Sequence, residues 1–178
     1  MTLPESPRLY LREFRAEDAE ALWTLNGDPE VVRYTLNVQE SLSDYAQRIA
    51  DYQDQYRSNG GRLGFFAAIE RATNRFVGWF HLRPSRGAPD RLDLGYRLRR
   101  DAWGQGYGTE MSRALIDYAF AQLGAPIVEA AALTGNRASI RVMEKCGMHR
   151  ADEFLYTARD GTKHPAVRYE INSPLQSL

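Results

Sequence analysis

The sequence predicts a mixed α/β fold built around a central strand that leads into a glycine-rich loop and then a helix. Leu92–Leu98 alternates apolar with other residues, as a strand does, and glycines follow at 104, 106 and 108. The next segment, Thr109–Phe120, carries apolar residues at helical spacing. Across the chain the patterns run strand, two helices, three strands, helix, strand, helix and two strands. This order, with about seven strands, is typical of a mixed sheet with flanking helices.

The other elements follow from the same periodicities and from turn residues. Before the central strand we expect a strand at 8–14, a helix at 16–26, a short turn begun by Asp28-Pro29, a helix from Ser41 or Ser43 to Ser58, and strands at 63–70 and 75–82 joined by a turn at 71–74. After the glycine helix we expect a strand at 127–133, a helix at 136–146, and strands at 148–157 and 164–171 joined by a turn at 159–162. The segment 83–91 contains two prolines and a glycine and is expected to be a loop.

Composition indicates a folded protein of a reducing compartment. Hydrophobic residues make up 43% and charged residues 26% of the 178 residues. Basic and acidic residues both number 23, without the basic excess of a general nucleic-acid binder. Cys146 is the only cysteine, so no internal disulfide forms. The chain lacks a signal-peptide pattern and an apolar run of membrane-spanning length. We expect one cytoplasmic domain over residues 1–178, with no nucleic-acid or membrane partner.

The glycine loop has the chemistry of a phosphate site. Glycines let the backbone approach a ligand closely, and the first amides of the following helix have no partner within it. The spacing G-x-G-x-G differs from the dinucleotide fingerprint G-x-G-x-x-G, and no lysine follows as in nucleotide triphosphate loops. The absence of repeated βαβ units also argues against a dinucleotide-binding oxidoreductase. Spacing alone leaves open a helix-start loop that binds no ligand.

Two motifs together indicate a family. Trp103–Glu110, following Gly95–Leu98, resembles the pyrophosphate loop of the GNAT N-acetyltransferases, most closely the branch of the ribosomal-protein N-terminal acetyltransferases, the RimJ/RimL-like proteins. Asn136–Met148 resembles the second signature of that branch, N-x-x-S-x-x-x-x-E-K-x-G-[FM]. The N-terminal patterns at 9–18 and 27–31 are similar as well, so the resemblance covers residues 8–171. It implies the GNAT fold, in which the central strand and the strand after the glycine helix splay apart around the pantetheine arm of acetyl-CoA.

The resemblance implies acetyl-CoA as cosubstrate and an oxyanion contact from a main-chain amide between Leu94 and Tyr96. The residues expected to contact acetyl-CoA are Tyr96, Arg97, Leu98, Gly104, Gln105, Gly106, Tyr107, Gly108, Thr109, Asn136, Ser139 and Arg141. Trp103 stands where many members have a phosphate-pairing Arg or Gln, and is expected to pack against helix or cofactor. Asn136 also suits a helix cap. Arg141 shares a helix face with Arg137 and Lys145, a row that is otherwise simply solvated.

Amine acetylation needs a base for the amine proton. Asp93 aligns with the carboxylate that several GNAT enzymes carry on this strand, so the resemblance makes it the candidate base. The alternative is a solvated aspartate on a strand. Glu110, Glu129 and Glu153 are rival bases, and an amine that arrives partly neutral needs no strong base.

The reaction also needs an acid for the departing thiolate. Many GNAT enzymes use a tyrosine seven residues after the asparagine, where this chain has Met143. The ribosomal branch offers Ser139 instead, one turn into the helix. The alternative is a serine bonded only to local backbone.

The resulting hypothesis is an acetyltransferase that moves the acetyl group of acetyl-CoA to a primary amine by direct attack in a ternary complex. A protein N-terminus, a polyamine, an aminoglycoside or an amino-acid derivative all fit as acceptor, and Trp23 and Tyr34 are the candidates to reach it. The alternative is a non-catalytic coenzyme A-binding or regulatory module, which would dispense with Asp93 and Ser139. The three histidines lack metal-ligand spacing, so no metal is expected. Monomer and homodimer both remain open.

Overall fold

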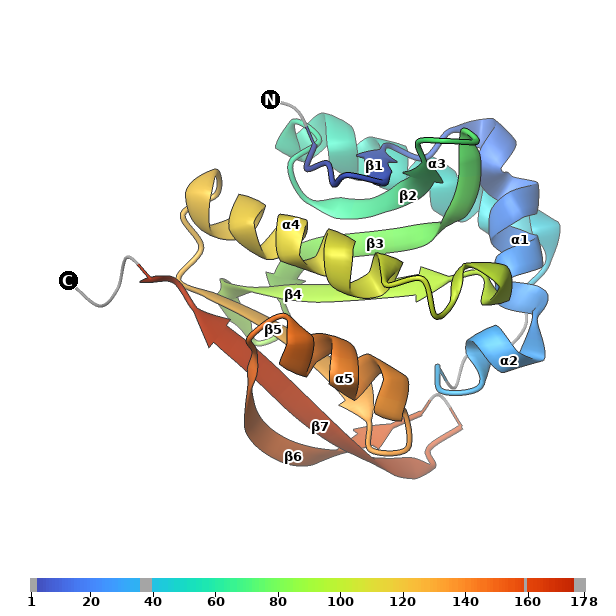
Figure 1. Cartoon of the computed structure of the whole chain (residues 1–178). Coiled ribbons are helices and arrows are strands. Elements are labelled where there is room, and N and C mark those ends of the chain that lie inside the picture. The colour runs from blue at the N-terminus through green and yellow to red at the C-terminus, as the bar shows by residue number, and fades with distance from the viewer. Residues whose placement is uncertain (1–2, 36–39, 159, 175–178) are drawn as a thin grey trace.

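The sheet in the computed structural model, which describes residues 3–35, 40–158 and 160–174, has seven strands in the order β1-β2-β3-β4-β5-β7-β6 (Figure 1). Their bounds are β1 Leu9–Arg12, β2 Gly64–Glu70, β3 Arg75–Ser85, β4 Ala88–Leu98, β5 Ile127–Leu133, β6 His149–Thr157 and β7 Lys163–Asn172. β4 and β5 are parallel, and every other neighbouring pair is antiparallel. The mixed α/β class with seven strands and flanking helices is therefore confirmed.

The helices lie on both faces of this sheet. They are α1 Ala19–Gly27, α2 Pro29–Val32, α3 Leu42–Asn59, α4 Tyr107–Ala121 and α5 Arg137–Lys145, with 3-10 turns at Ala16–Asp18 and Arg100–Ala102. In Figure 1, α4 and α5 lie in front of the sheet and α3 lies behind it. No helix in the described ranges is both long and apolar enough to span a membrane.

The helix ends follow the cap residues that the sequence indicates. The Asp28 side chain accepts a hydrogen bond from the Glu30 amide at the start of α2. Ser41 and Asp44 form a reciprocal capping box at the start of α3. Gly60 ends α3 with a left-handed φ of 68°. These three local signals place the start of α2 and both ends of α3 without reference to the rest of the fold.

Each face of the sheet carries its own apolar cluster. Ala68 belongs to the cluster beneath α4, whereas its neighbours Ala67 and Ile69 belong to the cluster beneath α1 and α3. Successive side chains of a strand point to opposite faces, so β2 is buried on both sides. The sheet is thus the middle layer, and any site that passes through it can receive ligands from two sides.

The expectation of a loop at residues 83–91 was wrong. β3 continues to Ser85 and β4 begins at Ala88, so the two strands form a hairpin with a two-residue turn in which Gly87 has a φ of 81°. Pro84 lies beyond the end of the pairing between β2 and β3, which stops at Leu82. Pro89 lies in an irregular stretch between the β3–β4 pairs. Each proline therefore occupies a position where its missing N–H costs little.

The last hairpin forms as expected. β6 and β7 pair from Thr157 and Lys163 onward, and Asp160 and Gly161 lie in the turn between them. Arg159, which the expected turn also included, lies outside the described residues.

The parallel strands β4 and β5 separate along their length. Their register pairs Arg91 with Ile127, and it ends where Asp93 faces Glu129. Beyond that point β4 keeps its pairing with β3 as far as Leu98, and β5 keeps its pairing with β7 as far as Leu133. The facing edges of β4 and β5 are therefore free of each other, and their backbone N–H and C=O groups are open to another partner. This gap is the position of the site.

Candidate active site

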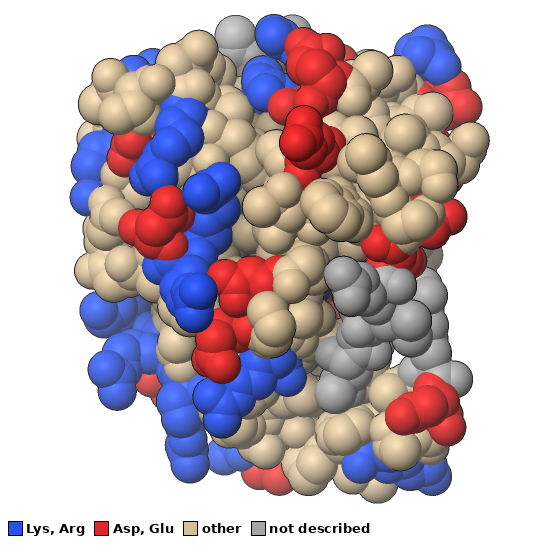
Figure 2. Space-filling model, turned by 90° about the vertical axis from the view of Figure 1, so that its right-hand side faces the viewer, with Lys and Arg blue, Asp and Glu red and all other residues tan. Residues whose placement is uncertain are grey.

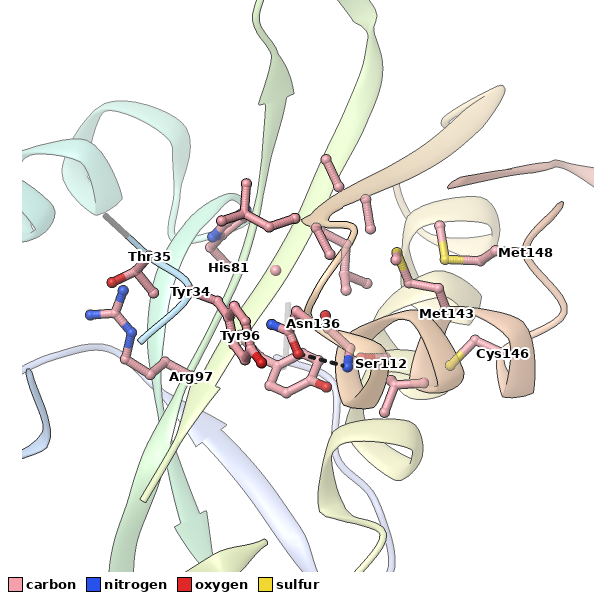
Figure 3. A pocket seen from close by; sticks show the side chains of 18 of the residues that line it. Tyr34, Thr35, His81, Tyr96, Arg97, Ser112, Asn136, Met143, Cys146 and Met148 are labelled. Carbon is pink, nitrogen blue, oxygen red and sulfur yellow. Dashed lines mark hydrogen bonds between the residues drawn. The ribbon is translucent and has the colours of Figure 1, made fainter. Parts of the chain in front are cut away.

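A groove and a cavity meet in the gap between β4 and β5, and Figure 3 shows side chains that line the cavity. The groove has a volume of about 470 Å³ and runs to the glycine loop, whereas the cavity has a volume of about 210 Å³ and passes between β4 and α5. The residues that line both are Tyr34, Thr35, Tyr96, Arg97, Asn136, Ser139 and Val142. These residues mark the junction at which two ligands could touch.

The far end of the groove is the start of α4. Gly104 and Gly106 both take left-handed backbone conformations, with φ of 74° and 82°. Gly106 is the N-cap of α4, and no side chain caps this end of the helix. The amides of the first turn thus remain available to a phosphate, with the positive end of the helix dipole behind them.

Basic side chains line the groove. Arg33, Arg141 and Lys145 belong to its walls, whereas Arg137 does not. Figure 2 views the molecule from the end where α1 and α2 lie, and Lys and Arg side chains gather along its left margin. A positively charged wall next to a helix start suits a ligand with several phosphates.

Most residues predicted to contact the cosubstrate line this groove. Gln105 is the exception, because its amide group donates to the Asp101 carbonyl at 2.9 Å and serves the loop itself. Trp103 also lines the groove, and its indole N–H donates to the Leu98 carbonyl at 2.9 Å. The Trp103 side chain therefore stabilises the loop through this hydrogen bond, and as an uncharged group it cannot form an ion pair with a phosphate.

Tyr96 and Ser139 hold two hydroxyl groups at the junction. The Ser139 amide donates to the Asn136 side chain at 3.2 Å, so Asn136 caps α5 as expected. Burial raises the pKa of Tyr96 to about 12, and a hydrogen bond with Ser139 acts in the opposite direction. A Cβ at Gly108 would lie 3.1 Å from the Tyr96 hydroxyl, so the bare backbone of α4 fixes this ring. Both hydroxyls therefore stay protonated at neutral pH and can donate.

Asp93 lines neither the cavity nor the groove. Its Oδ2 accepts from Arg83 at 2.8 and 3.0 Å and contacts His81 Nε2 at 3.2 Å. Burial alone would raise the pKa of Asp93, but the bonds and charges of His81 and Arg83 outweigh it and lower that pKa. Asp93 is therefore a carboxylate held by two donors, and one of them, His81, lines the cavity.

The rival bases are occupied elsewhere. Glu110 accepts from the Ser6 hydroxyl and from Arg8, which ties the N-terminal segment to α4. Glu129 accepts from Ser85, and Glu153 pairs with Arg150 on the surface. None of the three lines the groove or the cavity.

The two residues expected at the acceptor mouth differ. Tyr34 lines both groove and cavity, as expected. Trp23 lines neither, and 40% of it is exposed. The inward face of α1 carries Leu22 and Leu25, and Trp23 follows Leu22 by about 100° around the helix. The sequence-based assignment of Trp23 to the acceptor therefore finds no support in its position.

The cavity is also lined by Thr35, Trp79, His81 and Ser112, polar or aromatic residues that the sequence did not indicate as site residues. Trp79 and His81 alternate on one face of β3, a pattern that identifies the face but not its neighbours. The side chains of His81 and Ser112 each bury a polar atom, Nδ1 and Oγ, that has no hydrogen-bond partner in the described part of the chain. Such atoms are uncommon in folded proteins and mark this cavity as a place for ligand contacts.

Cys146 lines the cavity but is not a nucleophile at neutral pH. Burial raises the pKa of its thiol to about 11. Across the residues that the structure describes, no three His, Cys, Asp or Glu side chains are grouped to hold a metal ion.

Comparison with known proteins identifies the family. Residues 8–149 match the acetyltransferase (GNAT) domain. The chain is 30% identical over 186 residues to the FsC-acetyl coenzyme A-N(2)-transacetylase of Aspergillus fumigatus, covering 96% of this chain and 78% of that protein. A GNAT-family acetyltransferase of Bacillus anthracis superposes with a TM-score of 0.82 at 22% identity, covering 97% of this chain and 99% of the other. A ribosomal-protein-S5-alanine acetyltransferase of Vibrio fischeri gives a TM-score of 0.76 at 16% identity, covering 96% of each chain. The chain therefore belongs to the GNAT acetyltransferase family and is an N-acetyltransferase.

Proposed function

We propose that this protein transfers the acetyl group of acetyl-CoA to a primary amine by direct attack in a ternary complex. The observation that carries the proposal is the junction of groove and cavity at Tyr96 and Ser139. A thioester that arrives along the groove and an amine that arrives through the cavity would meet there. Holding both reactants in one place supplies much of the rate of such a reaction.

Each part of the groove has a role in this proposal. The amides at the start of α4 bind the pyrophosphate, with Arg141 beside them, and the free edge of β4 receives the pantetheine arm. An amide between Leu94 and Tyr96 stabilises the oxyanion. Ser139 hydrogen-bonds to, or protonates, the departing thiolate, and Asp93 assists deprotonation of the amine.

Arg97 restricts the acceptor. Its guanidinium lies 5.3 Å from the Trp79 ring centre and donates to Asn26, and it forms no ion pair with a carboxylate of the described residues. Burial lowers the pKa of this guanidinium, because water solvates the buried positive charge poorly. Figure 3 shows Arg97 beside Tyr34 and Thr35 at the junction. A cation here repels a polyamine and favours an amine that carries a carboxylate or carbonyl oxygen, as an amino-acid derivative or a protein N-terminus does.

The test is a panel of amines assayed for thiol release from acetyl-CoA, with wild-type protein and Arg97→Gln. We expect amines with a neighbouring carboxylate or carbonyl group to exceed spermidine in kcat/KM. Arg97→Gln should raise KM for the preferred acceptor about ten- to a hundredfold, which corresponds to the loss of one charged hydrogen bond. Arg57→Gln, at an exposed arginine paired with Asp54, is the matched control and should change nothing.

Two results would count against the proposal. Polyamines that outperform all other acceptors, with no effect of Arg97→Gln, would overturn the role of Arg97. Tight coenzyme A binding without thiol release for any amine would favour the non-catalytic module. The finer expectations belong to the same proposal: a RimJ/RimL-like branch, a single cytoplasmic domain, and a monomer or homodimer.

A further inference from the structure

The His81 ring lies against the bare backbone of β4. His81 faces Gly95 across the β3–β4 pair, and a Cβ on Gly95 would meet His81 Cε1 at 2.6 Å. Real Cβ contacts are not that short, so any larger residue at 95 would displace the imidazole. Gly95 also lies between Leu94 and Tyr96, the stretch proposed to supply the oxyanion amide. The ring is thus placed beside the carbon that an amine would attack.

One nitrogen of this ring is held by a fixed carboxylate. Asp93 Oδ2 contacts His81 Nε2 at 3.2 Å, and the same oxygen accepts both bonds from Arg83. A carboxylate only accepts hydrogen bonds, so Nε2 carries the proton. In neutral His81 the lone pair is then on Nδ1.

Nδ1 is the nitrogen that the protein leaves without a partner. It is buried and makes no hydrogen bond to any described residue, although His81 lines the cavity. The Phe65 ring lies 4.8 Å from the imidazole centre and the Trp79 ring 5.9 Å from it. In Figure 3, His81 lies on the side of the cavity that holds Tyr34, Thr35 and Arg97, opposite Met143 and Met148. A buried acceptor without a partner, in a residue that lines the cavity, is a group whose hydrogen bond a bound ligand could supply.

We propose that His81 is the general base for amine acetylation and that Asp93 is its positioning residue. The amine nitrogen attacks the thioester carbonyl carbon and forms the new C–N bond. Its proton passes to His81 Nδ1, directly or through one water, and later leaves to solvent. The C–S bond breaks with its electron pair on sulfur, and the thiolate takes a proton from Ser139 or water. This inference rests on the proposed function and replaces Asp93 by His81 as the group that accepts the proton.

The charges around His81 set its protonation state. Burial lowers the pKa of His81, the Asp93 carboxylate raises it, and the Arg83 guanidinium lowers it, with a net decrease. Other titratable groups nearby are Arg97 on β4, which faces Trp79, and Tyr52 on α3, which stacks on Phe65 at 4.9 Å. Tyr34, Tyr96 and Cys146 line the same cavity as His81. His81 is therefore neutral at pH 7 and able to accept a proton.

The experiment compares wild type, His81→Gln and Asp93→Asn by kcat at saturating acceptor across pH 5 to 9. Wild-type kcat should fall as pH decreases through an acid limb below about 6.5, the ordinary histidine value. His81→Gln should remove that limb and lower kcat at pH 7 by about 10² to 10⁴-fold, with unchanged coenzyme A affinity. His149→Gln, at an exposed histidine 3.5 Å from Glu170, is the matched control and should keep the wild-type profile.

The Asp93→Asn variant distinguishes the role of His81 as base from the role of Asp93 as positioning residue. Arg83 and His81 contact the same oxygen, so a single amide oxygen can keep both bonds while the charge is lost. Without that charge the pKa of His81 decreases, so the acid limb should move to lower pH with a smaller loss of kcat than in His81→Gln. If Asp93 were the base, Asp93→Asn would abolish turnover and His81→Gln would retain it. That result would overturn the inference.

A measurement on wild-type protein covers the case in which His81→Gln fails to fold. The chain has three histidines, and their imidazole proton resonances can be assigned with His149→Gln and His164→Gln. The remaining resonance should titrate at the pH of the kinetic limb and shift when the acceptor binds. No agreement between the two pH values would refute His81 as base. Failure of wild type to acetylate any amine would instead remove the proposed function, with the titration still readable.

Discussion

Replacing Gly106 by valine tests whether the glycine loop binds the cosubstrate. Gly106 has a φ of 82°, and a Cβ there would meet only Arg8 Nη2, at an ordinary 3.5 Å. The side chain therefore has room, and the penalty comes from the backbone. A left-handed conformation costs an L-residue about 1–2 kcal/mol, and more when it is β-branched. The loop can escape that strain only by turning its amides away from the ligand.

The backbone strain at residue 106 sets the expected losses of stability and of coenzyme A affinity in Gly106→Val. If the loop stays in place, stability decreases by about 1–2 kcal/mol, which lowers Tm by about 2–8 °C for a chain of this size. If it turns, at least one charged hydrogen bond to phosphate is lost, worth about 1.5–3 kcal/mol. Coenzyme A affinity then decreases about ten- to a hundredfold, because 1.4 kcal/mol corresponds to about tenfold. Calorimetric titration with coenzyme A measures the affinity, and thermal unfolding measures the stability.

Two matched variants make the result interpretable. Gly124→Val introduces comparable strain, at a φ of 64° in open space, near the opposite end of α4. It should lower stability without changing coenzyme A affinity. Gly106→Asn tolerates the left-handed conformation and should retain most of the affinity. Unchanged coenzyme A affinity in a folded Gly106→Val protein would refute the assignment of the phosphate site.

Two further predictions concern catalysis and stability. Ser139→Ala should lower kcat about ten- to a hundredfold while coenzyme A affinity stays nearly intact, because a hydroxyl that acts on developing charge contributes little to ground-state binding. Much weaker coenzyme A binding with normal turnover at saturation would instead make Ser139 a binding residue. Asp18→Asn should destabilise the protein by about 2 kcal/mol at pH 7, because Asp18 accepts from Arg12 at 2.6 and 2.7 Å and from the Arg15 amide at 2.8 Å. Burial raises the pKa of Asp18, but these hydrogen bonds lower it by more, so the net pKa lies below the ordinary value of about 3.9. The stabilisation is therefore complete above about pH 3.9 and disappears as the pH falls through the lowered pKa. Denaturant unfolding of both proteins at pH 7 and pH 3 checks this, and a stability difference that does not shrink at pH 3 would contradict it.

The sequence by itself determined the features that depend on local interactions. The period of apolar residues located seven strands and the main helices, and Ser41, Asp28 and Asn136 were recognisable as caps. The glycine loop before α4 was equally readable, because turn conformation and helix starts are governed by a few adjacent residues. These features were enough to predict the fold class, and the motifs at 103–110 and 136–148 carried the family resemblance that implied the groove residues.

Only the tertiary structure decided which side chains meet around the junction of groove and cavity. Pro84 faces Leu92 and Ser85 faces Ala88, so residues 89–91 have no partner on β3. This irregularity sets the register that brings Arg83 opposite Asp93 and His81 opposite Gly95. The expectation of a loop at 83–91 concealed this register, so the contacts of Asp93 with Arg83 and His81 could not be predicted from the sequence. Strand register depends on hydrogen bonds between distant segments and on bulges, which no local periodicity encodes.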